Sequence, residues 1–180
     1  DGFIRCDDGH WHWGTEGAAG LLAVWIDAEG TRRFALVRRA NCHRAGKYSI
    51  PGGAVIPGET AVQAALREAH EEVGLAASQA RVLGYLDPLL TITGFRVLPV
   101  VATITPDFVP TPDPGEVAEA FDVPLSLLLD PARLDRIELQ FGGRPRSVLQ
   151  YRYEPQRIWG VTASILFNLR ERLARATMTG

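Results

Sequence analysis

The stretch from Thr60 to Gly74 constrains the fold more than any other part of the chain, because it carries the full set of signals for one amphipathic helix. Thr60 and Gln63 have the spacing of a capping box, and Gly74 stands where a helix can end in a left-handed turn. Five apolar side chains recur at helical spacing: Val62, Ala65, Leu66, Ala69 and Val73. The sequence therefore predicts a helix that packs one apolar stripe against a core.

Three glutamates border this stripe. Glu68, Glu71 and Glu72 are spaced i, i+3, i+4, which places them within about a third of the helix circumference. A fourth acid, Glu59, lies just before the helix. One interpretation is an acidic face exposed to solvent. The other is a site for a hard cation such as Mg²⁺ or Mn²⁺, since charges at the border of a core repel strongly and the Gly-Gly pair upstream permits close approach of a ligand.

Short apolar runs upstream and downstream of the helix have the character of strands. Residues 18–26 and 34–37, joined by a turn at 27–30, predict a hairpin over 18–38. Proline clustering predicts a surface loop at 106–115. Further strands are expected at 81–86, 95–105, 116–123, 136–141 and 148–153, and helices at 125–129 and 161–174.

This alternation is typical of the α/β class, in which helices cover a sheet. The chain has 180 residues and shows no repeat or linker, so we expect a single domain over 1–180, with 1–17 as an N-terminal arm. Nineteen basic residues oppose 21 acidic ones, and this net charge of -2 argues against a general nucleic-acid binder. No apolar run approaches the roughly 20 residues that a membrane helix needs, so no membrane partner is expected.

The two cysteines, Cys6 and Cys42, are too few for a disulfide framework and favour a reduced, cytoplasmic setting. Cys6 could instead bind zinc together with His10 and His12, and with Cys42 or His43. The spacing of these residues matches no common zinc pattern, so both interpretations stay open.

The residues around the predicted helix also form a recognisable motif, in which a glycine, five residues, a glutamate and seven residues precede Arg-Glu-x-x-Glu-Glu-x-Gly. Its fixed positions are Gly53, Glu59, Arg67, Glu68, Glu71, Glu72 and Gly74. For this composition, seven such positions match by chance about once in 10⁸ starts. The segment from Gly53 to Leu75 thus resembles the Nudix box, and the chain is similar to the Nudix hydrolase family.

The resemblance implies an α/β/α sandwich with a mixed sheet and a hydrolase that depends on Mg²⁺ or Mn²⁺. Its substrate would be a small molecule in which a diphosphate joins a nucleoside to another group. Many members of the family pair up, so a homodimer is one of the states the resemblance allows. A Nudix-fold binding module without catalysis would be expected to lose box glutamates, whereas this chain keeps all four.

Carried over residue by residue, the box gives Glu68, Glu71 and Glu72 the role of metal ligands and Glu59 that of an outer or additional ligand. The other three positions are structural, in that Gly53 forms the loop into the helix, Arg67 orients the glutamates by salt bridges, and Gly74 ends the helix.

The general base differs among Nudix enzymes and is left open. Candidates are Glu71 and Glu72 in the box, and Glu116 and Glu119 after the proline-rich loop. Of the last two, Glu116 is favoured because it begins a strand-like run that resembles a recurrent Nudix element. Glu116 could equally be an acid on a surface loop.

Parts of the second half resemble the coenzyme A diphosphatase branch, namely residues 95–100, 116–125 and 158–163. Upstream of the box the match is partial. The spacing from Arg39 to Gly46 is shorter than in that branch, and Ile50 stands where the branch has a phenylalanine. The implied substrate is coenzyme A or a related compound, with ADP-ribose, a nucleotide sugar or an oxidised nucleoside triphosphate as alternatives. Arg38 and Arg39 could meet a substrate phosphate or be surface charge at a strand end.

Overall fold

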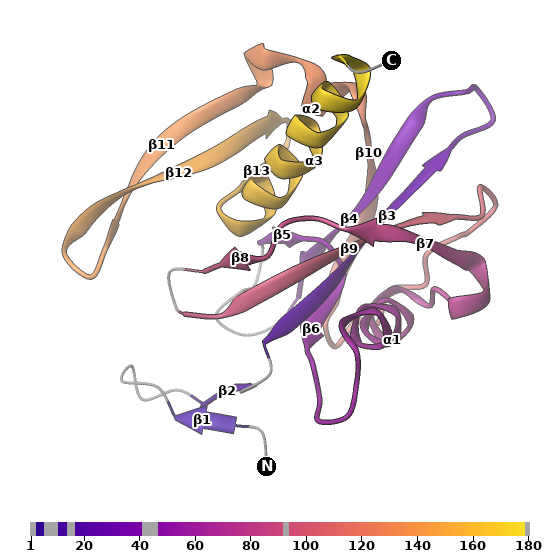
Figure 1. Ribbon diagram of the computed structural model, residues 1–180, viewed down its shortest axis with the longest axis horizontal. Coiled ribbons are helices and arrows are strands. Elements are labelled where there is room, and N and C mark those ends of the chain that lie inside the picture. The colour runs from indigo at the N-terminus through magenta and orange to yellow at the C-terminus, as the bar shows by residue number, and fades with distance from the viewer. Residues whose placement is uncertain (1–2, 6–10, 14–16, 41–46, 92–93, 179–180) are drawn as a thin grey trace.

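A mixed β-sheet occupies the middle of the molecule, with helix α1 (Ala61–Val73) on one face and helix α3 (Val161–Met178) on the other (Figure 1). The computed structural model describes residues 3–5, 11–13, 17–40, 47–91 and 94–178. The predicted α/β/α sandwich with a mixed sheet is therefore confirmed.

Eight strands make up this sheet. Their bounds are β3 (Ala18–Ile26), β4 (Arg32–Arg39), β5 (Tyr48–Ser49), β6 (Gly52–Ala54), β7 (Ala80–Tyr85), β8 (Leu89–Leu90), β9 (Arg96–Ile104) and β10 (Val117–Pro124). The order is β10-β4-β3-β9-β7, and β5, β6 and β8 pair with β4, β3 and β9 respectively. Only the β3–β9 pairing is parallel among the strands described in this sheet. The β3–β4 hairpin confirms the one predicted for residues 18–38.

Helix α1 begins and ends where its sequence predicts. The Thr60 hydroxyl accepts from the backbone N–H of Gln63, and the Gln63 side chain accepts from the backbone N–H of Thr60, which completes the capping box. Gly74 follows the last turn with a φ of 75°, a conformation that costs a glycine little. Local chemistry alone therefore fixes both ends of the helix that carries the glutamates.

The buried face of α1 differs in one respect from the expected stripe. Three alanines, Ala64, Ala65 and Ala69, are fully buried, and they let the helix approach the sheet closely. Glu72 lies on this same face and is completely buried, whereas Val62 and Leu66 are only partly buried. The box glutamates are thus not all at the border of the packed face, because the small alanine side chains let Glu72 lie between the helix and the sheet.

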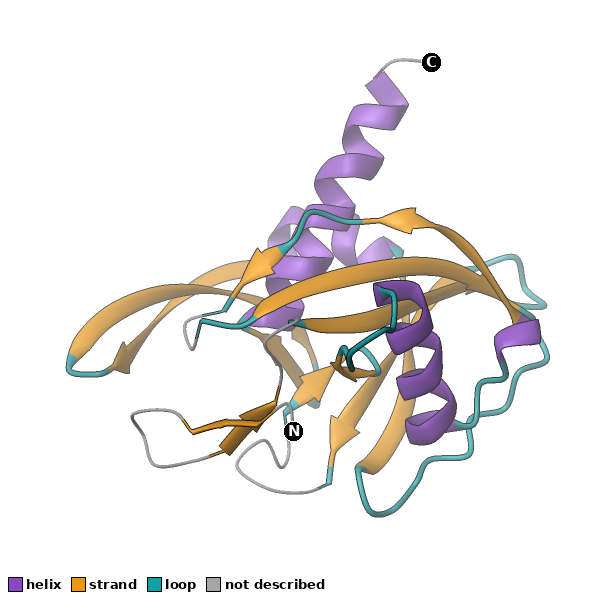
Figure 2. Cartoon of the chain, turned by 60° about the horizontal axis from the view of Figure 1, so that its bottom comes forward, coloured by secondary structure: helices purple, strands orange, loops and turns teal. Residues whose placement is uncertain are grey.

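The opposite face of the sheet is covered by α3 together with a second, three-stranded sheet. The strands of this second sheet are β11 (Leu134–Phe141), β12 (Arg144–Tyr153) and β13 (Gln156–Trp159), and the short helices α2 (Ser126–Leu129) and η3 (Pro131–Arg133) precede them. The order of the strands is β11-β12-β13, and both pairings are antiparallel. Figure 2 shows the C-terminal end of α3 extending beyond the body of the molecule.

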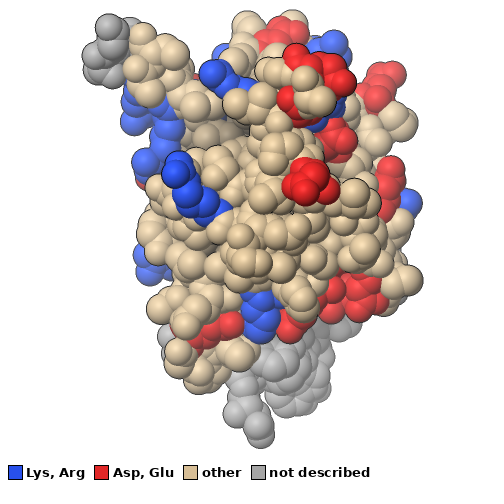
Figure 3. All heavy atoms as spheres, turned by 90° about the vertical axis from the view of Figure 1, so that its right-hand side faces the viewer, with Lys and Arg blue, Asp and Glu red and all other residues tan. Residues whose placement is uncertain are grey.

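The remaining segments are short. Strands β1 (Phe3–Arg5) and β2 (Trp11–Trp13) pair with each other in the N-terminal arm, and η2 (Ala77–Gln79) precedes β7. The loop predicted at 106–115 contains no helix or strand, as expected. Among the described helices, none has the length and apolar character required to cross a membrane. Acidic and basic side chains are scattered over the face drawn in Figure 3, which shows no broad basic surface.

Candidate active site

Arg67 connects three of the box glutamates. Its Nε and Nη2 donate to the two carboxylate oxygens of Glu59 at 2.9 and 3.1 Å, and its Nη1 donates to Glu68 at 2.8 Å and to Glu71 at 2.9 Å. Nη2 also donates to the Ala54 carbonyl, which ties the loop after β6 to the helix. The side chains of Glu59 and Glu68 are only 11% and 14% exposed, so these ion pairs are screened less than surface pairs.

A second arginine, Arg39, binds the fourth box glutamate, Glu72. Arg39, the last residue of β4, donates from Nη1 to Glu72 Oε1 and from Nη2 to the Gly52 carbonyl at 2.5 Å. Its Nε donates to Ser49 Oγ at 3.1 Å. The other carboxylate oxygen, Glu72 Oε2, is buried and has no hydrogen-bond partner among the described residues. Burial of a carboxylate oxygen without a partner costs free energy unless a cation or a hydrogen-bond donor reaches that oxygen.

Backbone contacts bring Glu116 to the same place. The backbone N–H of Asp113 donates to the Glu72 carbonyl at 3.0 Å, which holds the proline-rich loop against the end of α1. The backbone N–H of Ala40 donates to the Glu116 carbonyl at 2.8 Å. The Glu116 side chain is 52% exposed, and its Oε2 lies 4.0 Å from Arg39 Nη1. Glu116 therefore stands beside the box glutamates, with one side open to water.

Arg38 and Glu119 belong to another surface. Successive strand residues point to opposite faces, so Arg38 faces away from Glu72 whereas Arg39 faces toward it. Arg38 pairs with Glu119 across the β4–β10 ladder, at 3.1 Å between Nε and Oε2. Of the two arginines named as substrate binders, only Arg39 joins the glutamate cluster.

The two glycines that precede α1 have different surroundings. A Cβ atom at Gly52 would lie 2.5 Å from the carbonyl oxygen of Ala19 and from Cα of Gly20, both of which are backbone atoms. A Cβ atom at Gly53 would instead meet the Glu68 carboxylate, with Oε1 at 2.5 Å. Gly52 therefore permits the close contact between β6 and β3, and Gly53 leaves room for a glutamate of the box.

This difference predicts separable effects of two alanine substitutions. Gly52→Ala must displace backbone, and we expect it to lower the free energy of unfolding by about 1–3 kcal/mol or more. Gly53→Ala displaces a flexible carboxylate, so we expect a smaller loss of stability and a clear loss of hydrolytic rate. Urea unfolding and steady-state assays on both variants measure this contrast. Equal stability losses with equal rates would contradict the distinction.

Burial alters the acidity of the glutamates to different extents. Desolvation raises the pKa of Glu72 to about 7, in spite of the opposing effect of Arg39. Burial also raises the pKa of Glu68, while the Arg67 guanidinium lowers the pKa of Glu59. The negative charges of Glu68 and Glu116 add to the rise in the pKa of Glu72. The site therefore holds negative charge at a cost and would gain from a bound cation.

The raised pKa of Glu72 makes stability depend on pH. Between about 4.5, the ordinary pKa of the side chain, and about 7, the folded protein holds a proton that the unfolded chain releases. The contribution of Glu72 to stability is therefore complete below about 4.5 and is lost as the pH rises through about 7. We expect the free energy of unfolding, measured in a chelator, to fall over this range less steeply in Glu72→Gln than in the unchanged protein. Parallel pH profiles for the two proteins would refute this.

The donor set suits a hard divalent cation, because it combines carboxylates with the Gly52 carbonyl and includes the unpartnered Glu72 Oε2. As arranged, no three His, Cys, Asp or Glu side chains of the described residues converge closely enough to hold a metal ion. Arg67 and Arg39 instead bind one oxygen each of Glu68, Glu71 and Glu72 and both oxygens of Glu59. The zinc site considered for Cys6, His10, His12, Cys42 and His43 lies outside the residues whose side chains the structure describes.

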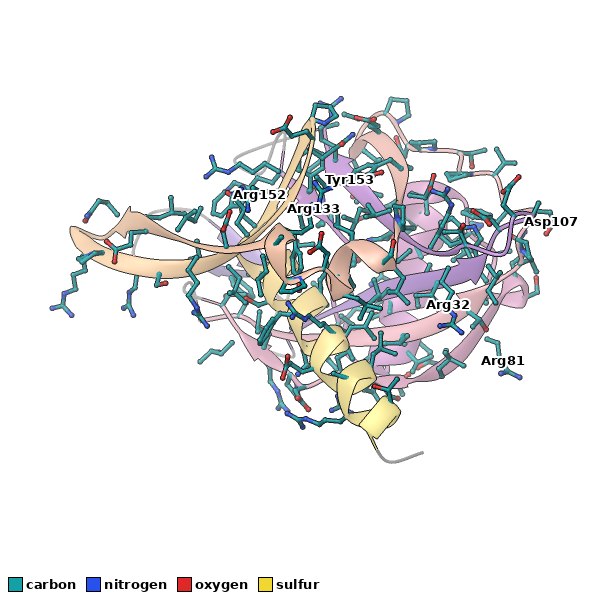
Figure 4. The ribbon with its side chains drawn as sticks, turned by 90° about the horizontal axis from the view of Figure 1, so that it is seen from above. Arg32, Arg81, Asp107, Arg133, Arg152 and Tyr153 are labelled. Carbon is teal, nitrogen blue, oxygen red and sulfur yellow. The ribbon has the colours of Figure 1, made fainter. Side chains whose placement is uncertain are left out.

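A surface cavity of about 1020 Å³ lies elsewhere, between α2, η3 and the end of β12. Arg133, Arg152 and Tyr153, which line it, lie near one another in Figure 4. Both of its arginines have acidic partners, since Arg133 pairs with Asp130 in the lining and Arg152 pairs with Asp135 outside it. None of the box residues lines this cavity. The chemistry of the box glutamates, rather than the volume of this hollow, therefore identifies the candidate site.

Two features of the site could not be found from the box alone. The contact of Arg39 with Glu72 and the Gly52 carbonyl depends on the pairing of β4 with β5 and of β3 with β6. The only sequence signal was the position of Arg39 at the end of a predicted strand. The approach of Glu116 depends on a loop that contacts the end of α1 through its backbone.

Comparison with known sequences identifies the family of the chain. The model of the NUDIX domain matches residues 18–140. The uncharacterized Nudix hydrolase NudL of Photorhabdus laumondii is 36% identical over 144 residues, which cover 79% of this chain and 75% of the relative. The NudL protein of Enterobacter sp. is 38% identical over 137 residues, covering 74% and 71% of the two chains.

Solved structures agree on the fold. A Nudix hydrolase from M. smegmatis, RenU, superposes with a TM-score of 0.64 and 27% identity, covering 99% of this chain and 96% of that one. The Ap4A hydrolase of C. elegans, in a binary complex, has a TM-score of 0.54 and 23% identity over 61% of this chain and 80% of its own, which supports the fold alone. The chain therefore belongs to the Nudix family, and it is a Nudix diphosphohydrolase.

Proposed function

We propose that the protein uses Mg²⁺ or Mn²⁺ to hydrolyse the diphosphate linkage of a nucleoside diphosphate derivative. The observation that carries this proposal is the buried Glu72, whose Oε2 has no partner among the described residues and whose neighbours include other carboxylates. Such a group needs a cation, and a diphosphate substrate brings further oxygens to the same cation. A binding module without catalysis would be expected to lose box glutamates, whereas this chain keeps all four.

Glu68, Glu71 and Glu72 are the proposed metal ligands, and Glu59 is a further ligand that also holds Arg67. A divalent cation held by these carboxylates would neutralise the diphosphate, polarise its P–O bond and acidify the attacking water. Arg67 keeps the carboxylates oriented through its contacts with Glu59, Glu68 and Glu71. Glu72 itself is fully buried, so bulk water does not reach its side chain.

Glu116 is the proposed general base. Its side chain is half exposed, so water can reach it, and Arg39 Nη1 lies 4.0 Å from its Oε2. A carboxylate with a free oxygen can accept the proton that the attacking water gives up. Glu71, half exposed on the helix, and Glu72 are the alternatives within the box.

We propose coenzyme A or a related compound as the substrate. The support is the position of the segment that resembles the coenzyme A diphosphatase branch. Thr162 donates from its hydroxyl to the Tyr48 carbonyl at 2.8 Å, and Lys47 Nζ lies 5.6 Å from the centre of the Trp159 ring. That segment thus contacts the strand that leads into the box, next to Ser49 and Arg39. The alternatives are ADP-ribose, a nucleotide sugar and an oxidised nucleoside triphosphate.

One assay tests the proposal. The protein is incubated with Mg²⁺ or Mn²⁺ and a panel of coenzyme A, ADP-ribose, nucleotide sugars, dinucleoside polyphosphates and nucleoside triphosphates, and the products are separated by chromatography. Parallel reactions contain a chelator in place of the metal. Turnover of coenzyme A that the chelator abolishes is the expected result. Turnover of ADP-ribose alone would remove the proposed substrate, and no turnover of any compound would remove the proposed activity.

A further inference from the structure

Arg39 holds two oxygens that a metal ion would also use. Its guanidinium donates to Glu72 Oε1 and, at 2.5 Å, to the Gly52 carbonyl, and its third contact is with Ser49. Carboxylate and backbone carbonyl oxygens are the ligands that hard divalent cations take. The Arg39 side chain is only 14% exposed, so its charge is held inside the site rather than in solvent.

Two cations cannot share these oxygens without strong repulsion, because charges in a partly buried site are weakly screened. A guanidinium also has only donors, so it cannot bind a metal itself. A metal that binds Glu72 through both oxygens therefore competes with Arg39 for Oε1. A second acceptor is within reach, since Glu116 Oε2 lies 4.0 Å from Arg39 Nη1.

We propose that Arg39 is a built-in counter-cation that competes with the catalytic metal for Glu72 and the Gly52 carbonyl, and that metal binding shifts its guanidinium toward Glu116. Arg39 then sets the metal affinity of the site, and the displaced guanidinium becomes available to an anionic substrate. The inference rests on the proposed function, which puts a divalent cation at the box glutamates.

Arg67 does not have this role, although it also contacts box glutamates. It bridges Glu59, Glu68 and Glu71, and none of its hydrogen bonds within the described residues goes to Glu72. Arg38 provides the matched control, because it is the same residue type at the next position of β4, and it pairs with Glu119 on the opposite face. Loss of Arg38 removes one positive charge nearby without freeing Glu72.

The test is binding of Mn²⁺ alone, measured by titration calorimetry on the full chain and on Arg39→Met, Arg39→Lys and Arg38→Met. We expect Arg39→Met to bind Mn²⁺ about 5- to 100-fold more tightly, the size of a typical coupling between two binding events. Arg39→Lys keeps the charge but loses the planar fork whose two nitrogens bind the two acceptors separately, so we expect a smaller gain. Arg38→Met should leave the affinity within about twofold of that of the unchanged protein.

Unchanged or weaker binding in Arg39→Met would overturn the inference, and so would an equal gain in Arg38→Met, which would show a general effect of charge. If Arg39→Met does not fold, the Mn²⁺ affinity of Arg39→Lys decides the test. Tighter binding than in the unchanged protein supports the competition, and equal or weaker binding rejects it. If the unchanged protein and every variant fail to bind Mn²⁺ or Mg²⁺, the proposed metal-dependent function fails with the inference. Binding by the unchanged protein with no gain in the Arg39 variants rejects the inference alone.

Discussion

Glu72→Gln is expected to lower kcat by about 10²–10⁴-fold, the range found when a group that handles charge or a proton in the transition state is removed. Glutamine has nearly the same shape but cannot carry the negative charge that a divalent cation needs. The fold should survive, because burial already disfavours the ionised form of Glu72, as its pKa of about 7 indicates. The measurements are kcat at saturating metal and thermal unfolding by circular dichroism.

The matched control for this variant is Glu138→Gln, which makes the same chemical change at an exposed position of β11. We expect its rate and its stability to stay close to those of the unchanged protein, since surface substitutions alter stability by about 0.5 kcal/mol or less. An unaffected rate in Glu72→Gln would mean that the metal site is misassigned. A variant that loses both activity and fold would mean that Glu72 acts mainly through packing.

Arg67→Met should have the second large effect. The substitution keeps most of the apolar stem but leaves Glu59, Glu68 and Glu71 facing one another without their common cation. Removing one partner of a buried ion pair costs about 3–5 kcal/mol, and because Arg67 is 28% exposed we expect about 2–3 kcal/mol here. Activity should fall by about 10²-fold or more, since misplaced catalytic groups lose that much.

Chemical denaturation with and without Mn²⁺ measures both parts of this expectation. Because a divalent cation can replace the missing positive charge, Mn²⁺ should stabilise Arg67→Met more than it stabilises the unchanged protein. Arg133→Met is the control, because Arg133 pairs with Asp130 on the surface at 3.5 Å and such pairs contribute about 0–1 kcal/mol. A stability loss no larger than that of the control would show that Arg67 does not hold the cluster together.

The parts of the protein that sequence predicted well depend on local chemistry. The ends of α1 follow from Thr60, Gln63 and Gly74, whose capping preferences act within one turn of the helix. The β3–β4 hairpin follows from two apolar runs and a turn in which Asp27 accepts hydrogen bonds from the backbone N–H of Glu29 and Thr31. The proximity of Glu71 to Arg67 also follows from helical spacing, because the two residues stand four positions apart on one helix.

Strands that depend on partners far along the chain were harder to predict. The short strands β6 and β8 and the strand β13 were not expected, because two to four residues carry no periodic signal. Strands β11 and β12 are longer than the segments 136–141 and 148–153, since pairing across the hairpin extends the ladder into polar residues. Helix α3 likewise runs to Met178, beyond the apolar spacing that marked it to residue 174.

The sequence by itself determined the helix, its caps and the spacing of its glutamates, because these features need only neighbouring residues. Tertiary structure alone decided which glutamate is buried and which arginine meets it. Glu72 is buried because the alanines of α1 allow the helix to lie close to the sheet. Arg39 reaches Glu72, and Arg38 does not, because the strand register assigns successive side chains to opposite faces.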